Sequence, residues 1–159
     1  MQYVETTEDF FKRMGYGLNT SVAEALAIKE RNPAASNAEI AKMNILSKRD
    51  AYAAAGNWGM YSVTVSNLLR VYGLLGDYEQ ELECLLQTFY MTLSAGRQYT
   101  PALISQIASA AEKCNLELSG VVEKYEASVG MLPSLLVPVA SSEYAAMLRN
   151  DLVGAGYPS

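Results

Sequence analysis

The densest group of side chains that could do chemistry is a run of carboxylates near the middle of the chain: Asp77, Glu79, Glu81 and Glu83. Carboxylates brought together can act as a general acid and a general base. These four, however, fall at the start of a helix predicted to begin after Gly76, where negative charge complements the helix dipole. We therefore interpret them as stabilising the start of that helix rather than as catalytic groups.

Other catalytic chemistries lack the residues they need. The sequence has no histidine, which removes Ser–His and Cys–His nucleophile pairs, imidazole acid–base catalysis and most zinc or iron sites. Cys84 and Cys114 stand far apart in the sequence, without metal-ligand spacing, and we interpret them as buried or half-buried thiols. No phosphate-binding loop, dinucleotide fingerprint or calcium loop is present. The sequence therefore predicts no catalytic residue, no metal site and no cofactor.

Composition and charge narrow the class of protein further. Half of the residues are apolar and 18% are charged, which is typical of a folded globule. Residues 51–159 carry ten acidic and five basic side chains, and an acidic body repels nucleic-acid backbones. The polar, acidic segment 1–9 has no signal-peptide features, and no apolar run approaches the length of a membrane span. We expect a cytoplasmic protein that binds neither membranes nor, in general, nucleic acid.

Turn signals divide the chain into helices. Gly56, Gly76 and Gly96 stand twenty residues apart at predicted helix ends, where glycine adopts the left-handed conformation that other residues avoid. A Gly15-Tyr16-Gly17 turn ends an earlier helix, and residues 154–159 are expected to fray. Apolar periodicity and capping residues predict helices over residues 7–14, 21–31, 36–55, 58–75, 77–95, 100–114, 118–129 and 142–153.

These elements predict an all-α fold, with antiparallel helical hairpins forming a compact bundle or a short α-solenoid. We expect one domain over residues 1–159. Its three parts are short N-terminal helices in 1–35, core hairpins in 36–114, and C-terminal helices in 115–159 that include the apolar, proline-containing segment 131–139. The helix over 58–75 carries a single charge, Arg70, so we expect it at the buried centre of the fold.

One stretch resembles a known repeat family. Residues 68–89, with the turn Leu75-Gly76-Asp77-Tyr78-Glu79, resemble the middle of a tetratricopeptide repeat, where one helix ends and the next begins. Glu81 stands where that family has a small alanine, and the glycine spacing is shorter than its period of about 34 residues. The resemblance implies a helical-hairpin protein that binds peptides or proteins on a concave face.

A second stretch, residues 39–49, looks like part of a DNA-binding helix-turn-helix. It holds the basic residues Lys42, Lys48 and Arg49, but Asn44 and Ile45 stand in the reverse of the order that the family's turn expects. We favour one continuous helix here. A DNA-binding regulator that uses residues 39–52 is kept as an alternative, as is a small-ligand-binding helical protein.

The function predicted from these observations is a non-enzymatic protein–protein interaction module, which acts as an adaptor, a scaffold or an inhibitor. Its partner is another protein or a second copy of itself, because stacked hairpins bury one face and leave another for partners. The predicted binding surface combines the polar side of 77–95 with the apolar segment 131–139. Its residues are Glu79, Glu83, Gln87, Leu132, Leu135, Leu136 and Val137.

Overall fold

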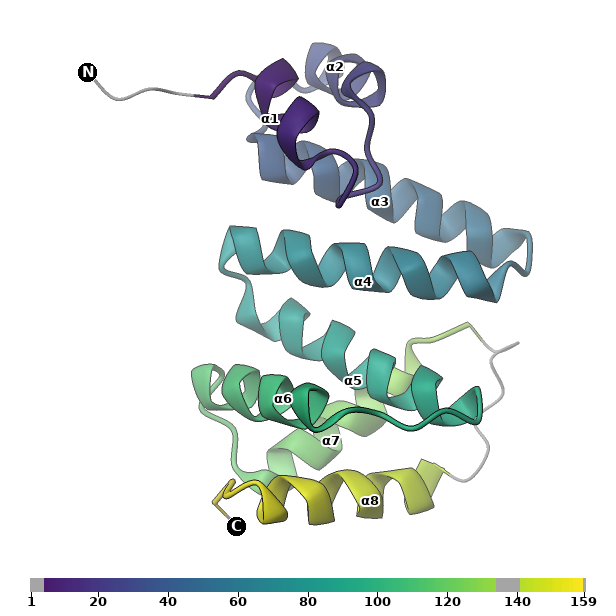
Figure 1. Cartoon of the computed structure of the whole chain (residues 1–159), viewed down its shortest axis with the longest axis vertical. Coiled ribbons are helices and arrows are strands. Elements are labelled where there is room, and N and C mark those ends of the chain that lie inside the picture. The colour runs from purple at the N-terminus through teal and green to yellow at the C-terminus, as the bar shows by residue number, and fades with distance from the viewer. Residues whose placement is uncertain (1–4, 134–140, 159) are drawn as a thin grey trace. The chain divides into compact units, whose positions relative to one another are not determined.

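The structure, a computed structural model, describes residues 5–133 and 141–158, with the backbone alone at 141 and 142. In these ranges the chain forms eight α-helices and no strand, which confirms the all-α prediction (Figure 1). The helices fall into two compact units that divide between Gly76 and Asp77. The single domain over residues 1–159, with its three parts, stays a prediction.

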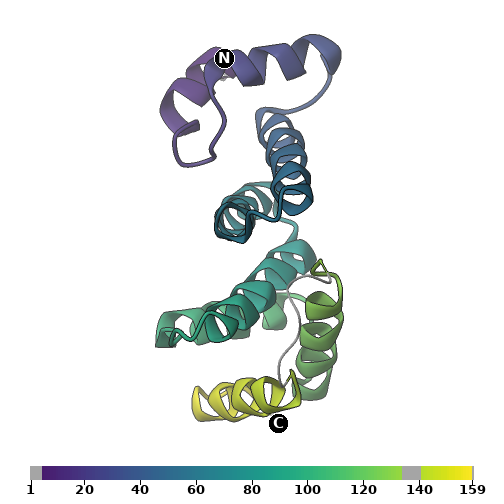
Figure 2. The same cartoon turned by 90° about the vertical axis from the view of Figure 1, so that its right-hand side faces the viewer.

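The first unit contains four helices: α1 (Thr7–Met14), α2 (Val22–Arg31), α3 (Asn37–Ala54) and α4 (Trp58–Leu75). Within this unit, helices that are neighbours along the chain pack on one another, in the manner of a solenoid. The most extensive pairing is between α3 and α4, which lie antiparallel and side by side in both views (Figures 1 and 2). This pair is the hairpin that the Gly56 turn predicts.

The second unit is a four-helix arrangement of α5 (Tyr78–Ser94), α6 (Pro101–Lys113), α7 (Leu118–Gly130) and α8 (Ser141–Gly154). Helix α5 packs on both α6 and α7, and α8 packs on the same two helices. The second unit is therefore a bundle, whereas the first is a succession of neighbours.

Local sequence explains where the helices begin and end. The capping boxes at Ser21 and Ser36 are both formed, with each serine hydroxyl accepting from the N–H of the glutamate three residues later. Such caps contribute about 1 kcal/mol each. Gly56, Gly76 and Gly96 adopt φ values of 69°, 68° and 73°, so the predicted left-handed helix ends are confirmed.

The predicted place of helix 58–75 at the buried centre is wrong. The buried residues of α4 lie at three- and four-residue steps on one face, and Ser66, Arg70 and Gly73 on the opposite side are exposed. Small and hydroxylated residues tolerate water, so a shortage of charge did not require cover. The helix buried most completely is α5, in which every residue from 82 to 87 is buried.

Candidate functional site

The predicted polar binding face of α5 is only partly on the surface. Glu79 is exposed, whereas Glu83 is 9% exposed and Gln87 is 4% exposed. The Gln87 side-chain amide donates a 3.0 Å hydrogen bond to the Ser128 carbonyl on α7. The prediction that Glu83 and Gln87 lie on the exposed side of this helix is therefore wrong, because a buried amide serves packing between α5 and α7. Glu79 stays a prediction as a partner-binding residue.

The apolar part of the predicted surface is mostly beyond what the structure describes. Leu132 is buried, with 7% of its surface exposed, and its N–H donates to the carbonyl of Val129 at the end of α7. Leu135, Leu136 and Val137 lie outside the described residues. Leu132 thus belongs to the core of the second unit.

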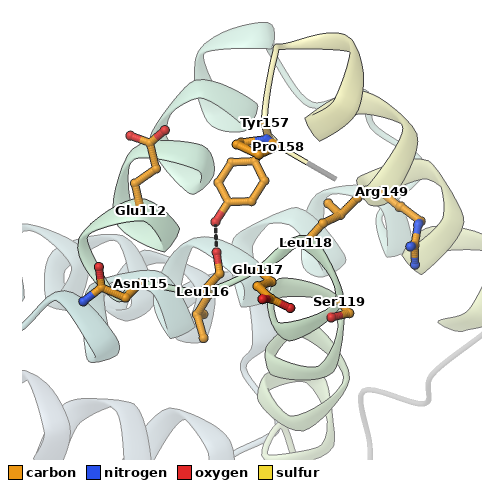
Figure 3. Close-up of a pocket in the computed structure, with 9 residues that line it drawn as sticks. All are labelled: Glu112, Asn115, Leu116, Glu117, Leu118, Ser119, Arg149, Tyr157 and Pro158. Carbon is orange, nitrogen blue, oxygen red and sulfur yellow. Dashed lines mark hydrogen bonds between the residues drawn. The ribbon is translucent and has the colours of Figure 1, made fainter.

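A pocket of about 550 Å³ lies in the second unit, where the loop between α6 and α7 meets the end of α8 (Figure 3). We call it the Tyr157 pocket, because the Tyr157 ring points into it from the C-terminal segment and its hydroxyl donates to the Leu116 carbonyl. Tyr157 is 6% exposed. The prediction that residues 154–159 fray is therefore wrong at this tyrosine. The lining comprises Glu112, Asn115, Leu116, Glu117, Leu118, Ser119, Arg149, Tyr157 and Pro158.

The charged groups of this pocket are available to a ligand. Glu117 is the N-cap residue of α7, but its side chain makes no capping hydrogen bond. No ion pair with a described residue is formed by any of the three charged lining residues, Glu112, Glu117 and Arg149. Burial, followed by the Glu112 carboxylate, raises the pKa of Tyr157, so this phenol stays protonated around neutral pH.

A second feature is the Tyr16 loop, residues 15–20, between α1 and α2. Backbone hydrogen bonds close it, including a 2.9 Å bond from the Thr20 N–H to the Gly15 carbonyl. Two side chains of α3 hold the loop by hydrogen bonds. The Asn44 amide donates to the Thr20 hydroxyl at 3.0 Å, and the Lys48 ammonium donates to the Asn19 carbonyl.

Helix α4 holds the same loop once, since Arg70 Nη1 donates to the Gly17 carbonyl at 3.3 Å. Leu18 is fully buried beneath the loop. The Tyr16 side chain, at the centre of this fixed backbone, is fully exposed. Sequence reasoning treated Gly15-Tyr16-Gly17 only as a helix end. Its one local signal is an aromatic residue between glycines, outside any apolar helical stripe.

The most reactive side chains in the sequence are the thiols of Cys84 and Cys114. Cys84 is buried and Cys114 is half-buried. Burial, and after it the Glu79 carboxylate, raises the pKa of Cys114, which disfavours the reactive thiolate. In the described ranges no three metal-binding side chains gather in one place.

The helix-turn-helix resemblance has no turn in the structure. Residues 39–52 lie within the single helix α3, and Asn44 is a buried residue of that helix. Lys48 is engaged with Glu24 at 3.0 Å, and Arg49 lies 3.9 Å from Asp50. The favoured prediction of one continuous helix is confirmed.

Comparisons with known proteins add no relatives: no protein-family model, curated protein or solved structure matches the chain. None of the helices in the described part of the chain is both long and apolar enough to cross a bilayer.

Proposed function

We propose that this chain is a non-enzymatic protein–protein interaction module of the cytoplasm, and that it binds its partner through the Tyr16 loop. The observation that carries the proposal is the full exposure of Tyr16 on a backbone fixed from two other helices. An exposed tyrosine offers an apolar ring and a polar tip, and tyrosine is enriched among the residues that dominate binding energy.

The fixed backbone supports the same proposal. A loop that is already ordered loses little conformational freedom on binding, so more of its contact energy appears as affinity. The loop is held by side chains from two later helices: Asn44, Lys48 and Arg70. These bonds fix the loop backbone and leave the Tyr16 side chain exposed. The tetratricopeptide-like turn at Gly76 agrees with a helical protein that binds proteins, and the acidic second unit argues against nucleic acid as a general partner.

The test is affinity capture from cells of the native host with four forms of the full chain: wild type, Tyr16→Ala, Tyr16→Phe and Val63→Ala. Val63, on α4, is 42% exposed and serves as the matched loss of an exposed apolar side chain. We expect Tyr16→Ala to lose a defined set of bound proteins that Tyr16→Phe and Val63→Ala retain. Identical bound proteins from all four forms would refute the proposal.

A further inference from the structure

We propose that the partner of the Tyr16 loop is a second copy of this chain, and that Tyr16 and Arg70 of one copy dock into the Tyr157 pocket of the next. This inference rests on the proposed function, because it names the partner of the same loop. It assigns a role to the Tyr157 pocket, whose lining residues all come from the second unit.

The projecting side of the contact is the Tyr16 loop, with an exposed aromatic residue and a cation that is bonded to the loop backbone. Arg70 is exposed, and its only hydrogen bond to a described residue joins Nη1 to the Gly17 carbonyl. It forms no ion pair with a described carboxylate. The guanidinium has five N–H donors, so several remain for a partner. The exposed cation is therefore held at Gly17, the residue that follows Tyr16 in the loop.

The receiving side has complementary groups. Leu116, Leu118 and Pro158 give the Tyr157 pocket apolar surface, and the carboxylates of Glu112 and Glu117 give it unpaired negative charge. In Figure 3, Glu112 and Arg149 lie on opposite sides of Tyr157. In the proposed contact the incoming guanidinium pairs with Glu112 on one side of Tyr157, while Arg149 lies on the other side.

The charge balance of the two units favours the same pairing. The first unit has eight basic and seven acidic side chains, a net charge of +1, whereas the second has four basic and ten acidic, a net charge of −6. Contact between second units would bring like charges together. Contact between the first unit of one copy and the second unit of another brings opposite charges together and steers the encounter.

Such a contact is heterologous, because two different surfaces meet. An open assembly of any size keeps one unused loop at one end and one unused pocket at the other, so association continues into a ring or an open chain. This property provides a stringent test. A copy with a damaged loop and a copy with a damaged pocket should each self-associate more weakly than wild type, yet should bind one another once.

The experiment is sedimentation velocity of the full chain over a range of concentrations, at low and at high ionic strength. Wild type should form species larger than a dimer, and high salt should weaken them. Two variants should each weaken self-association by about tenfold or more: Tyr16→Ala and Ser119→Arg. The first lacks the ring, and the second fills the pocket and places a positive charge opposite Arg70. Their mixture should form a one-to-one dimer. Val63→Ala should behave as wild type, and far-UV circular dichroism verifies that each variant is folded.

Three results would overturn the inference. They are a monomeric wild type at every concentration, unchanged association of Tyr16→Ala, or a mixture of the two variants that fails to form a dimer. A small molecule as the pocket's occupant would appear as association that Ser119→Arg leaves unchanged. If the wild type is monomeric while host proteins are still captured through Tyr16, only this inference fails. If Tyr16→Ala changes neither association nor capture, the proposed function fails with it.

Discussion

Replacing Gly15 by alanine tests whether the Tyr16 loop is as tightly built as its hydrogen bonds indicate. Gly15 has an ordinary helical backbone, with φ of −59° and ψ of −38°, so alanine causes no conformational strain there. Its added Cβ, however, would lie 2.3 Å from the Thr20 carbonyl oxygen and 2.4 Å from the Phe11 carbonyl oxygen. Both are backbone atoms, so neither can move without shifting the loop or the end of α1.

The expected cost follows from three contributions. Overpacking against fixed atoms costs about 1–3 kcal/mol. The bonds from the Gly15 N–H to Phe11 and from the Thr20 N–H to Gly15, each 2.9 Å long, would be strained or lost, at about 1 kcal/mol apiece. Alanine restricts the unfolded chain, which returns about 0.4–1 kcal/mol. The net loss in free energy of unfolding is about 2 to 5 kcal/mol.

Gly17→Ala is the matched control. Its Cβ would lie 2.3 Å from Arg70 Nη1, the free end of a flexible side chain that can swing into water. Only an exposed hydrogen bond would be lost, so we expect a cost below about 1 kcal/mol. Urea unfolding followed by tryptophan fluorescence measures both variants, because Trp58 is the single tryptophan and lies in α4 of the first unit.

A Gly15→Ala variant whose free energy of unfolding lies within about 0.5 kcal/mol of the wild-type value would refute this expectation. A change that small is typical of an ordinary surface position. The expectation is equally refuted if Gly17→Ala costs as much as Gly15→Ala, because backbone and side-chain neighbours would then be equivalent.

Further predictions concern the second unit. Gln87→Ala should lower the free energy of unfolding by about 2 kcal/mol, since it leaves the buried Ser128 carbonyl without its donor. Glu79→Ala, at an exposed position, should change it by less than about 0.5 kcal/mol. Chemical denaturation followed by circular dichroism compares the two variants. Burial, and after it the hydrogen bond to the Asp151 carboxylate, raises the pKa of Tyr99 from 10.0 to about 12. The folded unit therefore holds this proton more tightly than the unfolded chain, and its contribution to stability, full below pH 10, should be lost as the pH rises towards 12; thermal melts across this range would contradict the assignment if stability stayed constant. Alkylation of Cys114 at neutral pH should be slower than that of an ordinary exposed thiol and should accelerate in Glu79→Gln, because the second-largest cause of its raised pKa is removed; mass spectrometry of the alkylated peptide measures the rate, and an unchanged rate would oppose this explanation.

Element boundaries were predictable because their causes are local. A capping box at Ser21 or Ser36 needs only a hydroxyl and a glutamate three residues later, and both boxes form. Gly56 and Gly76 likewise end helices through backbone geometry that depends on the residue itself. The sequence therefore contained nearly all the information needed to place the helices.

Surface and core were less predictable because their causes lie far along the chain. The amide of Gln87 finds its acceptor 41 residues away, at Ser128, and nothing near Gln87 announces that partner. Tyr157 is buried for a similar reason, since its acceptor at Leu116 is equally distant. The exposed position of Tyr16 was hidden because the residues that hold its loop, Asn44 and Arg70, come from later helices.

The complete burial of residues 82–87 in α5 has a consequence for the genetics of this protein. On a helix with one buried face, such as α4, damaging substitutions should recur every three or four positions, with tolerant sites between them. Along α5 they should form an unbroken block that includes Glu83 and Gln87, whose polarity alone would suggest tolerance. A saturation library would thus record α5 as a continuous interval of constraint and α4 as a periodic one.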